Sequence, residues 1–89
     1  MDWKEIFRIS DIRILMYLND NQEVRYSELL KNVVSTRSVL STALQDLRRR
    51  KLVDRTIDSK DVIQSKYKLT DKGSKLVRLL TDIQKIVST

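Results

Sequence analysis

The stretch from Ser35 to Val53, STRSVLSTALQDLRRRKLV, constrains the fold of this chain more than any other. Its apolar residues recur at helical spacing, which predicts a helix with one apolar side: Leu40, Ala43, Leu44 and Leu47. The other side offers hydroxyls, an amide and an arginine: Thr36, Arg37, Ser38, Ser41, Thr42 and Gln45. Such side chains near a helix N-terminus contact base edges in a DNA major groove. We therefore expect a DNA-recognition helix at about residues 36–50.

Most of the chain's excess positive charge lies in the same stretch. The whole sequence carries 18 Lys and Arg against 12 Asp and Glu, a net charge of +6, which moderately favours polyanionic partners. Residues 35–51 hold five of these cations and one acidic residue. The basic run from Arg48 to Lys51 ends the predicted helix. An alternative is that these cations only stabilise the negative end of the helix dipole.

Length and composition exclude several classes of protein. A chain of 89 residues is expected to form a single domain. The sequence contains no cysteine and no histidine, so disulfides, transition-metal sites and histidine-based acid–base relays are not expected, and no cofactor is indicated. The sequence has neither an apolar run long enough to span a membrane nor a signal-peptide pattern. We expect a cytoplasmic, nucleoid-associated protein.

The hydrophobic periodicity changes along the chain in an informative order. Helical patterns cover residues 11–18, with Ile12, Leu15, Met16 and Leu18 expected in the core, and then residues 28–33 and the recognition helix. A short strand is possible at 23–26. Alternating patterns at 53–57 and 62–69 predict a β-hairpin, or wing, around a polar turn at 58–61. Thr70 is expected to cap a last helix from Asp71 to about Val87.

This order predicts a mainly α protein with a small β-hairpin (α+β). More specifically, the order predicts a winged helix-turn-helix at 10–69, with an extra N-terminal helix at 1–9 and a long C-terminal helix at 70–89. From Asp11 to Leu80 the chain resembles winged-helix transcription regulators of the MarR, HxlR and PadR type. Besides the recognition stretch, the segment YKLTDKG at 67–73 resembles the end of the wing and the start of the C-terminal helix in that family.

The resemblance implies that a homodimer binds double-stranded DNA and regulates transcription. The chain departs from the family where a glycine commonly follows the recognition helix, because Lys51 stands there. A left-handed Lys costs about 1 kcal/mol more than Gly, which favours a helix that runs on by one residue. Family members often sense small ligands, but the residues here signal none. The scarcity of Gly, Pro and Cys is compatible with a small archaeal or archaeal-virus protein.

The predicted DNA contacts fall into three groups. Arg37, Ser41, Thr42 and Gln45 are expected at base edges, because Arg matches guanine and Gln matches adenine. Phosphates are assigned to Thr36 and Ser38 at the helix N-terminus and to Arg48, Arg49 and Arg50 at its end. From the wing, Lys60, Lys66 and Lys68 are expected near flanking phosphates or the minor groove. As alternatives, Thr36 only caps the helix, Ser41 and Thr42 form a solvated face, and the wing lysines only prevent edge pairing.

Both ends of the chain are expected to form the dimer interface. The last helix carries Leu76, Leu80, Ile83 and Val87 at alternating spacings of four and three, and Leu79 widens this apolar side. At the other end, Trp3, Ile6 and Phe7 form an apolar patch. We expect these to pack across a two-fold axis that separates two recognition helices by about 34 Å. The alternative is that both ends complete the core of one monomer.

Two other functions compete with sequence-specific regulation. Small basic winged helices also serve as non-specific architectural DNA-binding proteins and as protein-interaction modules. An enzyme is the least expected function, because no pair of nucleophile and base is visible. Asp58 and Asp61 in the hairpin turn have the chemistry of a cation site, but carboxylates in an exposed turn usually stabilise the turn itself.

Overall fold

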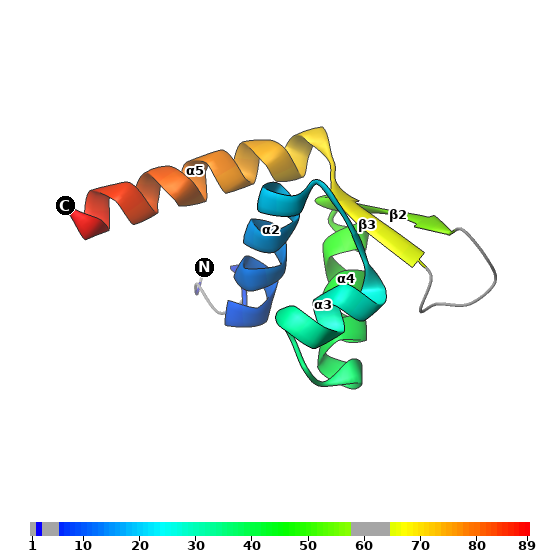
Figure 1. The fold of residues 1–89 in the computed structure, drawn as a ribbon. Coiled ribbons are helices and arrows are strands. Elements are labelled where there is room, and N and C mark those ends of the chain that lie inside the picture. The colour runs from blue at the N-terminus through cyan, green and yellow to red at the C-terminus, as the bar shows by residue number, and fades with distance from the viewer. Residues whose placement is uncertain (1, 3–5, 58–64) are drawn as a thin grey trace.

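The computed structural model describes residue 2 and residues 6–57 and 65–89, and these form helices packed against a small sheet (Figure 1). In chain order the elements are α2 (Ile9–Asn21), β1 (Glu23–Arg25), α3 (Tyr26–Asn32), α4 (Arg37–Arg49), β2 (Val53–Ile57), β3 (Ser65–Leu69) and α5 (Asp71–Ser88). The predicted fold class is confirmed, and so is the order of elements from α2 onward. Of the helix predicted at 1–9, residues 1 and 3–5 lie outside the described residues, Phe7 and Arg8 are not helical, and Ile9 already begins α2. The turn at 58–61, the strand residues 62–64 and Trp3 lie outside the described residues.

Helix α4 forms where the apolar spacing predicts it and buries the predicted side. Leu40, Ala43, Leu44 and Leu47 are all buried, and each is at most 2% exposed. They pack in one core with residues of α2, α3, the sheet and Val77 of α5. Because α4 contributes four residues to that core, its opposite side is fixed towards solvent.

Helix α2 is longer than predicted and its buried side is different. It starts at Ile9 and continues through the expected turn to Asn21. Ile14 is fully buried instead of Ile12, which is exposed on the surface. The buried positions 11, 14, 15 and 18 repeat at helical spacing, but the first is Asp11, so the pattern does not look apolar in the sequence. One oxygen of the Asp11 carboxylate accepts a hydrogen bond from the Arg8 backbone N–H at 2.9 Å and lies 3.7 Å from the Arg8 Nε, whereas the other is buried without a hydrogen-bond partner among the described residues.

The predicted hairpin is part of a three-stranded antiparallel sheet in the described residues, with the order β1-β3-β2. The strand predicted at 23–26 ends at Arg25, because Tyr26 already begins α3. Val24, Tyr67 and Arg55 lie side by side across the three strands, and Val24 and Tyr67 are buried beneath the sheet. Strand β1 therefore ties the wing to the helix-turn-helix.

The expectation that α4 continues by one residue at Lys51 is wrong. The last helical residue is Arg49, and Lys51 takes the left-handed conformation with φ of 62°. The Lys51 N–H donates to the Arg48 carbonyl at 2.9 Å, and the Leu52 N–H donates to the Leu47 carbonyl at 3.0 Å. These two bonds make a Schellman motif, with Leu47 and Leu52 as its buried apolar pair. The satisfied carbonyls and this apolar contact offset the cost of a left-handed lysine.

Helix α5 begins beside that turn. The Thr70 hydroxyl accepts a hydrogen bond from the Gly73 N–H at 3.0 Å, which confirms the predicted cap. The same hydroxyl donates to the Lys51 carbonyl at 2.6 Å, and the Thr70 N–H donates to the Leu52 carbonyl at 3.1 Å. The end of α4, the start of β2 and the start of α5 are thus joined in one hydrogen-bonded junction.

The far half of α5 extends past α2 and away from the rest of the fold (Figure 1). Its first half contributes the buried Gly73 and Val77. Beyond these, the apolar Leu79, Ile83, Ile86 and Val87 are exposed. Among the residues that the structure describes, none belongs to a helix both long and apolar enough to cross a membrane.

Candidate nucleic-acid interface

The solvent side of α4 presents the predicted polar residues as one surface. Arg37 begins the helix, and the exposed polar residues that follow it are Ser38, Ser41, Thr42, Gln45, Arg48 and Arg49. All lie away from the apolar stripe that fixes the helix to the core. The geometry therefore brings hydroxyl, amide and guanidinium groups to the same face, which is the chemistry that recognises base edges and phosphates.

The N-terminus of α4 has the properties of an anion site. Thr36 is the N-cap residue, but its hydroxyl does not accept a capping hydrogen bond from the part of the chain that is described. The first amides of a helix have no intrahelical acceptor and carry partial positive charge. The Thr36 hydroxyl and these amides are thus available to a phosphate.

Two cations that sequence analysis missed lie close to this N-terminus. Arg13 of α2 and Lys31 of α3 line the same surface hollow as Ser35, Thr36 and Val39. Arg13 is far from Thr36 in the sequence, and only the packing of α2 beside the α3–α4 turn brings them together. The sequence contained no local signal for this grouping.

A second hollow lies between α4 and the inner face of the sheet. It is lined by Tyr26, Ser41, Leu44, Gln45, Arg48, Arg55 and Tyr67. Arg55 was also missed by sequence analysis, although it alternates with solvent-facing Asp54 and Thr56 and so belongs to the inner face. Its Nε is buried and has no hydrogen-bond partner among the described residues. The hollow thus combines two guanidinium groups with the hydroxyls of two tyrosines.

Burial raises the pKa of the Tyr67 hydroxyl above its ordinary value of 10.0. The guanidinium of Arg55 acts in the opposite direction through a hydrogen bond and through its charge, and the charge of Arg48 adds to that lowering. Desolvation is the larger effect, because the ring is buried beneath the sheet. Tyr67 is therefore neutral at physiological pH and can donate a hydrogen bond.

A buried phenol supports the exposed face of α4 from behind. The Tyr26 hydroxyl oxygen lies 2.7 Å from the Ser41 Oγ. It also donates to the Arg37 carbonyl, at an oxygen–oxygen distance of 3.4 Å. Ser41 is thus both exposed and held in place, whereas the sequence alone suggested either a base contact or a solvated hydroxyl.

The structure separates the three arginines that end the helix. Arg48 is exposed beside the sheet, and Arg49 forms an ion pair with Asp46 at the surface. Arg50 turns towards the N-terminal segment. Its guanidinium donates to the Ile6 carbonyl, pairs with Asp46 at 3.2 Å and lies 5.8 Å from the centre of the Phe7 ring. The geometry therefore gives Arg50 a role in anchoring residues 6–7 and leaves Arg48 free to face a ligand.

The described wing lysines lie on the outer face of the sheet. Lys68 is exposed, with Glu23 opposite it on β1 and Asp54 opposite it on β2. Lys66 is half-buried, and its Nζ lies 3.8 Å from a carboxylate oxygen of Glu23. Acidic neighbours thus reduce the positive potential around both lysines. Lys60 lies outside the described residues.

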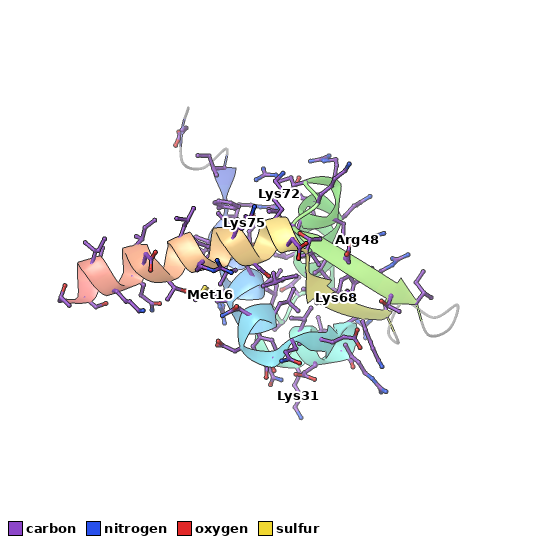
Figure 2. The ribbon with its side chains drawn as sticks, turned by 90° about the horizontal axis from the view of Figure 1, so that it is seen from above. Met16, Lys31, Arg48, Lys68, Lys72 and Lys75 are labelled. Atoms are coloured by element: carbon purple, nitrogen blue, oxygen red, sulfur yellow. The ribbon has the colours of Figure 1, made fainter. Side chains whose placement is uncertain are left out.

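Figure 2 shows Arg48, Lys68 and Lys72, which come from α4, β3 and α5, around the junction of these elements. Lys72 donates to the Arg50 carbonyl at 3.0 Å, so it also contributes to the end of α4. In the part of the chain that is described, no group of acidic, Cys or His residues has the arrangement of a metal site.

The residues predicted at a dimer interface divide into two sets. Phe7 and Leu76 are partly buried against the core of the same chain, and Ile6 and Leu80 are half-buried. Leu79, Ile83 and Val87 are exposed along the projecting half of α5, Val87 to 78%. An open groove between α2 and α5 is lined in part by Ile12, Met16, Leu80 and Ile83. Figure 2 shows Met16 on α2 beside α5.

Solved structures with a similar fold come from winged-helix regulators. MepR of S. aureus in complex with DNA is 27% identical with a TM-score of 0.80, and the match covers 93% of this chain and 68% of MepR. FabT of Streptococcus pneumoniae in complex with DNA is 22% identical, with a TM-score of 0.79 and coverage of 92% and 57%. BpsR of Bordetella bronchiseptica is 18% identical, with a TM-score of 0.78 and coverage of 92% and 59%.

The chain thus spans 57% to 68% of the length of these three proteins. The likeness to FabT and BpsR concerns the fold, because their sequence identity is low. No curated protein matches the chain in sequence.

The family comparison covers nearly the whole chain. The HxlR-like helix-turn-helix family matches residues 10–89, which include α4, the described wing strands and α5. Its members are transcription regulators and not enzymes. With the winged-helix fold and the polar face of α4 in place, the chain belongs to the HxlR-like helix-turn-helix family.

Proposed function

We propose that this protein is a sequence-specific regulator of transcription that binds double-stranded DNA as a homodimer, with α4 in the major groove. The observation that carries the proposal is the exposed face of α4, where hydroxyl, amide and guanidinium groups lie opposite a fully buried apolar stripe. A helix with such a face can enter a groove without exposing its core. MepR, which is 27% identical, has been solved as a complex with DNA.

In the proposed complex the residues have distinct roles. Arg37, Ser41, Thr42 and Gln45 contact base edges, and Thr36, Ser38, Arg48 and Arg49 contact phosphates. Arg13 and Lys31 join the phosphate contacts at the N-terminus of α4, because they line the same hollow as Thr36. The wing lies near the backbone or the minor groove, with Lys60, Lys66 and Lys68 as its cations.

The dimer in this proposal uses the projecting half of α5. Its apolar side chains Leu79, Ile83, Ile86 and Val87 are 53% to 78% exposed, and association would cover them. Arg50 holds Ile6 and Phe7 against the end of α4 of the same chain, so their part in the dimer interface stays a prediction. Two copies related by a two-fold axis would place their recognition helices about 34 Å apart on a pseudo-palindromic site.

The decisive experiment selects bound duplexes from a random DNA pool and then titrates the selected site against scrambled duplex at two salt concentrations. A preference of about a thousandfold for an inverted repeat supports the proposed function. Salt-sensitive binding without preference would instead indicate an architectural DNA-binding protein. A lack of binding at low salt would leave a protein-interaction module.

Whether a small molecule controls the protein is a separate question. PcaV of Streptomyces coelicolor, 25% identical, has been solved with its natural ligand. The residues of the present chain gave no signal for such an effector, and its absence stays a prediction.

A further inference from the structure

The contact between Tyr26 and Ser41 determines which hydrogen-bonding group Ser41 can offer to DNA. Tyr26 is only 3% exposed, whereas Ser41 is exposed on the face of α4. The phenol oxygen has two neighbours, the Ser41 Oγ at 2.7 Å and the Arg37 carbonyl oxygen at 3.4 Å. Both distances are within hydrogen-bonding range, so the single phenolic hydrogen must be assigned to one of them.

The chemistry of the three groups allows one assignment that satisfies both contacts. A carbonyl oxygen can only accept, so Tyr26 donates its hydrogen to Arg37. The shorter contact then requires a hydrogen from the other partner, and Ser41 donates to the Tyr26 oxygen. A serine hydroxyl has one hydrogen and two lone pairs. With its hydrogen directed inwards to Tyr26, Ser41 presents only lone pairs to the exterior.

We propose that Ser41 is a specificity-determining residue that acts only as an acceptor, and that Tyr26 is the positioning residue that enforces this. The inference rests on the proposed function. In the major groove, adenine and cytosine present an amino group that donates a hydrogen bond, whereas guanine and thymine present only acceptors there. The base that faces Ser41 is therefore adenine or cytosine. Guanine or thymine at that place would set two lone pairs against each other.

The test measures the base preference at every position of the selected site, for the wild type and for two variants. The wild type is expected to bind a site with adenine or cytosine opposite Ser41 about tenfold more tightly than one with guanine or thymine, a usual cost for one mismatched pair. Ser41→Ala should abolish the preference at this one position. Tyr26→Phe should reduce the preference for adenine or cytosine to about threefold or less. Without the Tyr26 oxygen as its acceptor, the Ser41 hydroxyl can rotate and donate to guanine or thymine.

Matched controls separate this effect from a loss of stability. Tyr17→Phe also removes a tyrosine hydroxyl that forms a hydrogen bond, at 2.8 Å to the Glu28 carboxylate. This hydrogen bond joins α2 to α3 and does not involve α4. Ser38→Ala removes an exposed serine from α4 that has no hydrogen bond to a tyrosine among the described residues. Tyr17→Phe should leave both the affinity and the preference opposite Ser41 unchanged. Ser38→Ala, at a proposed phosphate contact, should lower the affinity for all sites alike and leave that preference unchanged. A merely structural role of Tyr26 would weaken binding to all sites equally without changing the order of bases.

Several outcomes would overturn the inference. A guanine or thymine preference that disappears in Ser41→Ala would show that Ser41 donates. An unchanged preference in folded Tyr26→Phe would show that Tyr26 does not control the hydroxyl. If Tyr26→Phe does not fold, as judged by circular dichroism, Ser41→Thr provides the second test, because it keeps the hydroxyl and should keep the preference. Failure to select any site would instead refute the proposed function itself.

Discussion

The first turn of α5 rests directly on the backbone carbonyl of Leu52, at Gly73. A Cβ placed on Gly73 would overlap the Leu52 oxygen, and it would lie 3.1 Å from the Leu52 carbonyl carbon and 3.3 Å from a methyl carbon of Leu69. The Leu52 carbonyl cannot easily move, because it accepts the hydrogen bond from the Thr70 N–H. The close approach of these two backbones therefore requires glycine at residue 73.

Gly73→Ala should destabilise the protein by about 2 kcal/mol, a usual cost of overpacking. The sign is opposite to helix propensity alone, which favours alanine over glycine by about 1 kcal/mol. Urea unfolding measures the effect, with Ser74→Ala as the control at the next helical position. Equal stability of Gly73→Ala and the wild type would mean that α5 can shift away from Leu52 without cost.

Lys51→Gly should stabilise the protein by about 1 kcal/mol. Lys51 has φ of 62°, a conformation that glycine adopts without the clash of a Cβ. Lys51→Ala is the matched control, because it removes the same charge but keeps the Cβ, and it should give no stabilisation. Urea unfolding midpoints of Lys51→Gly and Lys51→Ala measure the difference. Identical midpoints would contradict the assignment of backbone strain to residue 51.

Arg48→Ala and Arg50→Ala should affect different properties. Arg48 is exposed on the side of α4 that is proposed to face DNA, so its removal should weaken DNA binding and lower the slope of log affinity against log salt by about one, with little change in stability. Arg50 anchors Ile6 and Phe7, so Arg50→Ala should lower stability by about 1 kcal/mol. Salt titrations and unfolding curves on both variants measure this, and a reversal of the two effects would refute the assignment.

Ile83→Asp should convert the proposed dimer into a monomer of 10.5 kDa. Ile83 is 53% exposed on α5, and burying a charge there against a second copy would be strongly unfavourable. Ile57→Asp is a matched control, since Ile57 is 54% exposed but lies on β2. Light scattering at micromolar concentration distinguishes the species. A monomeric wild type would rule out the proposed dimer at that concentration.

Stability should fall at alkaline pH because of Tyr67. Its folded-state pKa is raised above 10.0, so the folded protein holds this proton more tightly than the unfolded chain does. The resulting stabilisation is complete below pH 10.0 and is lost as the pH rises through the folded-state value. Tyr67→Phe should reduce this loss in unfolding curves measured from pH 8 to 11. Tyr17 also has a raised pKa, first through its hydrogen bond to Glu28, so Tyr17→Phe is measured in parallel.

Sequence patterns were sufficient for the elements whose periodicity is set by burial alone. The apolar spacing predicted α4, the alternation predicted β2, and Thr70 predicted the start of α5. Patterns failed where a polar residue occupies a buried position. Asp11 interrupts the apolar side of α2. For this reason Ile12 was predicted in the core, whereas Ile14 is the residue that is buried.

The candidate interface was only partly predictable for a related reason. The face of α4 follows from one helix and its period. In contrast, Arg13, Lys31 and Arg55 reach the interface through the packing of other elements, which local spacing does not encode. Arg50 contacts Ile6 and Phe7 instead of facing solvent beside Arg48 and Arg49. Local spacing could not predict this contact, because Arg50 and Ile6 are 44 positions apart. Lys51 was mispredicted because propensity ignores the two hydrogen bonds that close the helix.

The junction of α4, β2 and α5 makes the long C-terminal helix a lever arm. With 18 residues at about 1.5 Å per residue, α5 is about 27 Å long, so a tilt of about 10° at its first residue moves its far end by about 5 Å. Conversely, a displacement of the far end of α5 would strain the hydrogen bond between the Thr70 hydroxyl and the Lys51 carbonyl at its base. In the proposed dimer, the angle between the two α4 helices would then be set by how the two α5 helices pack together.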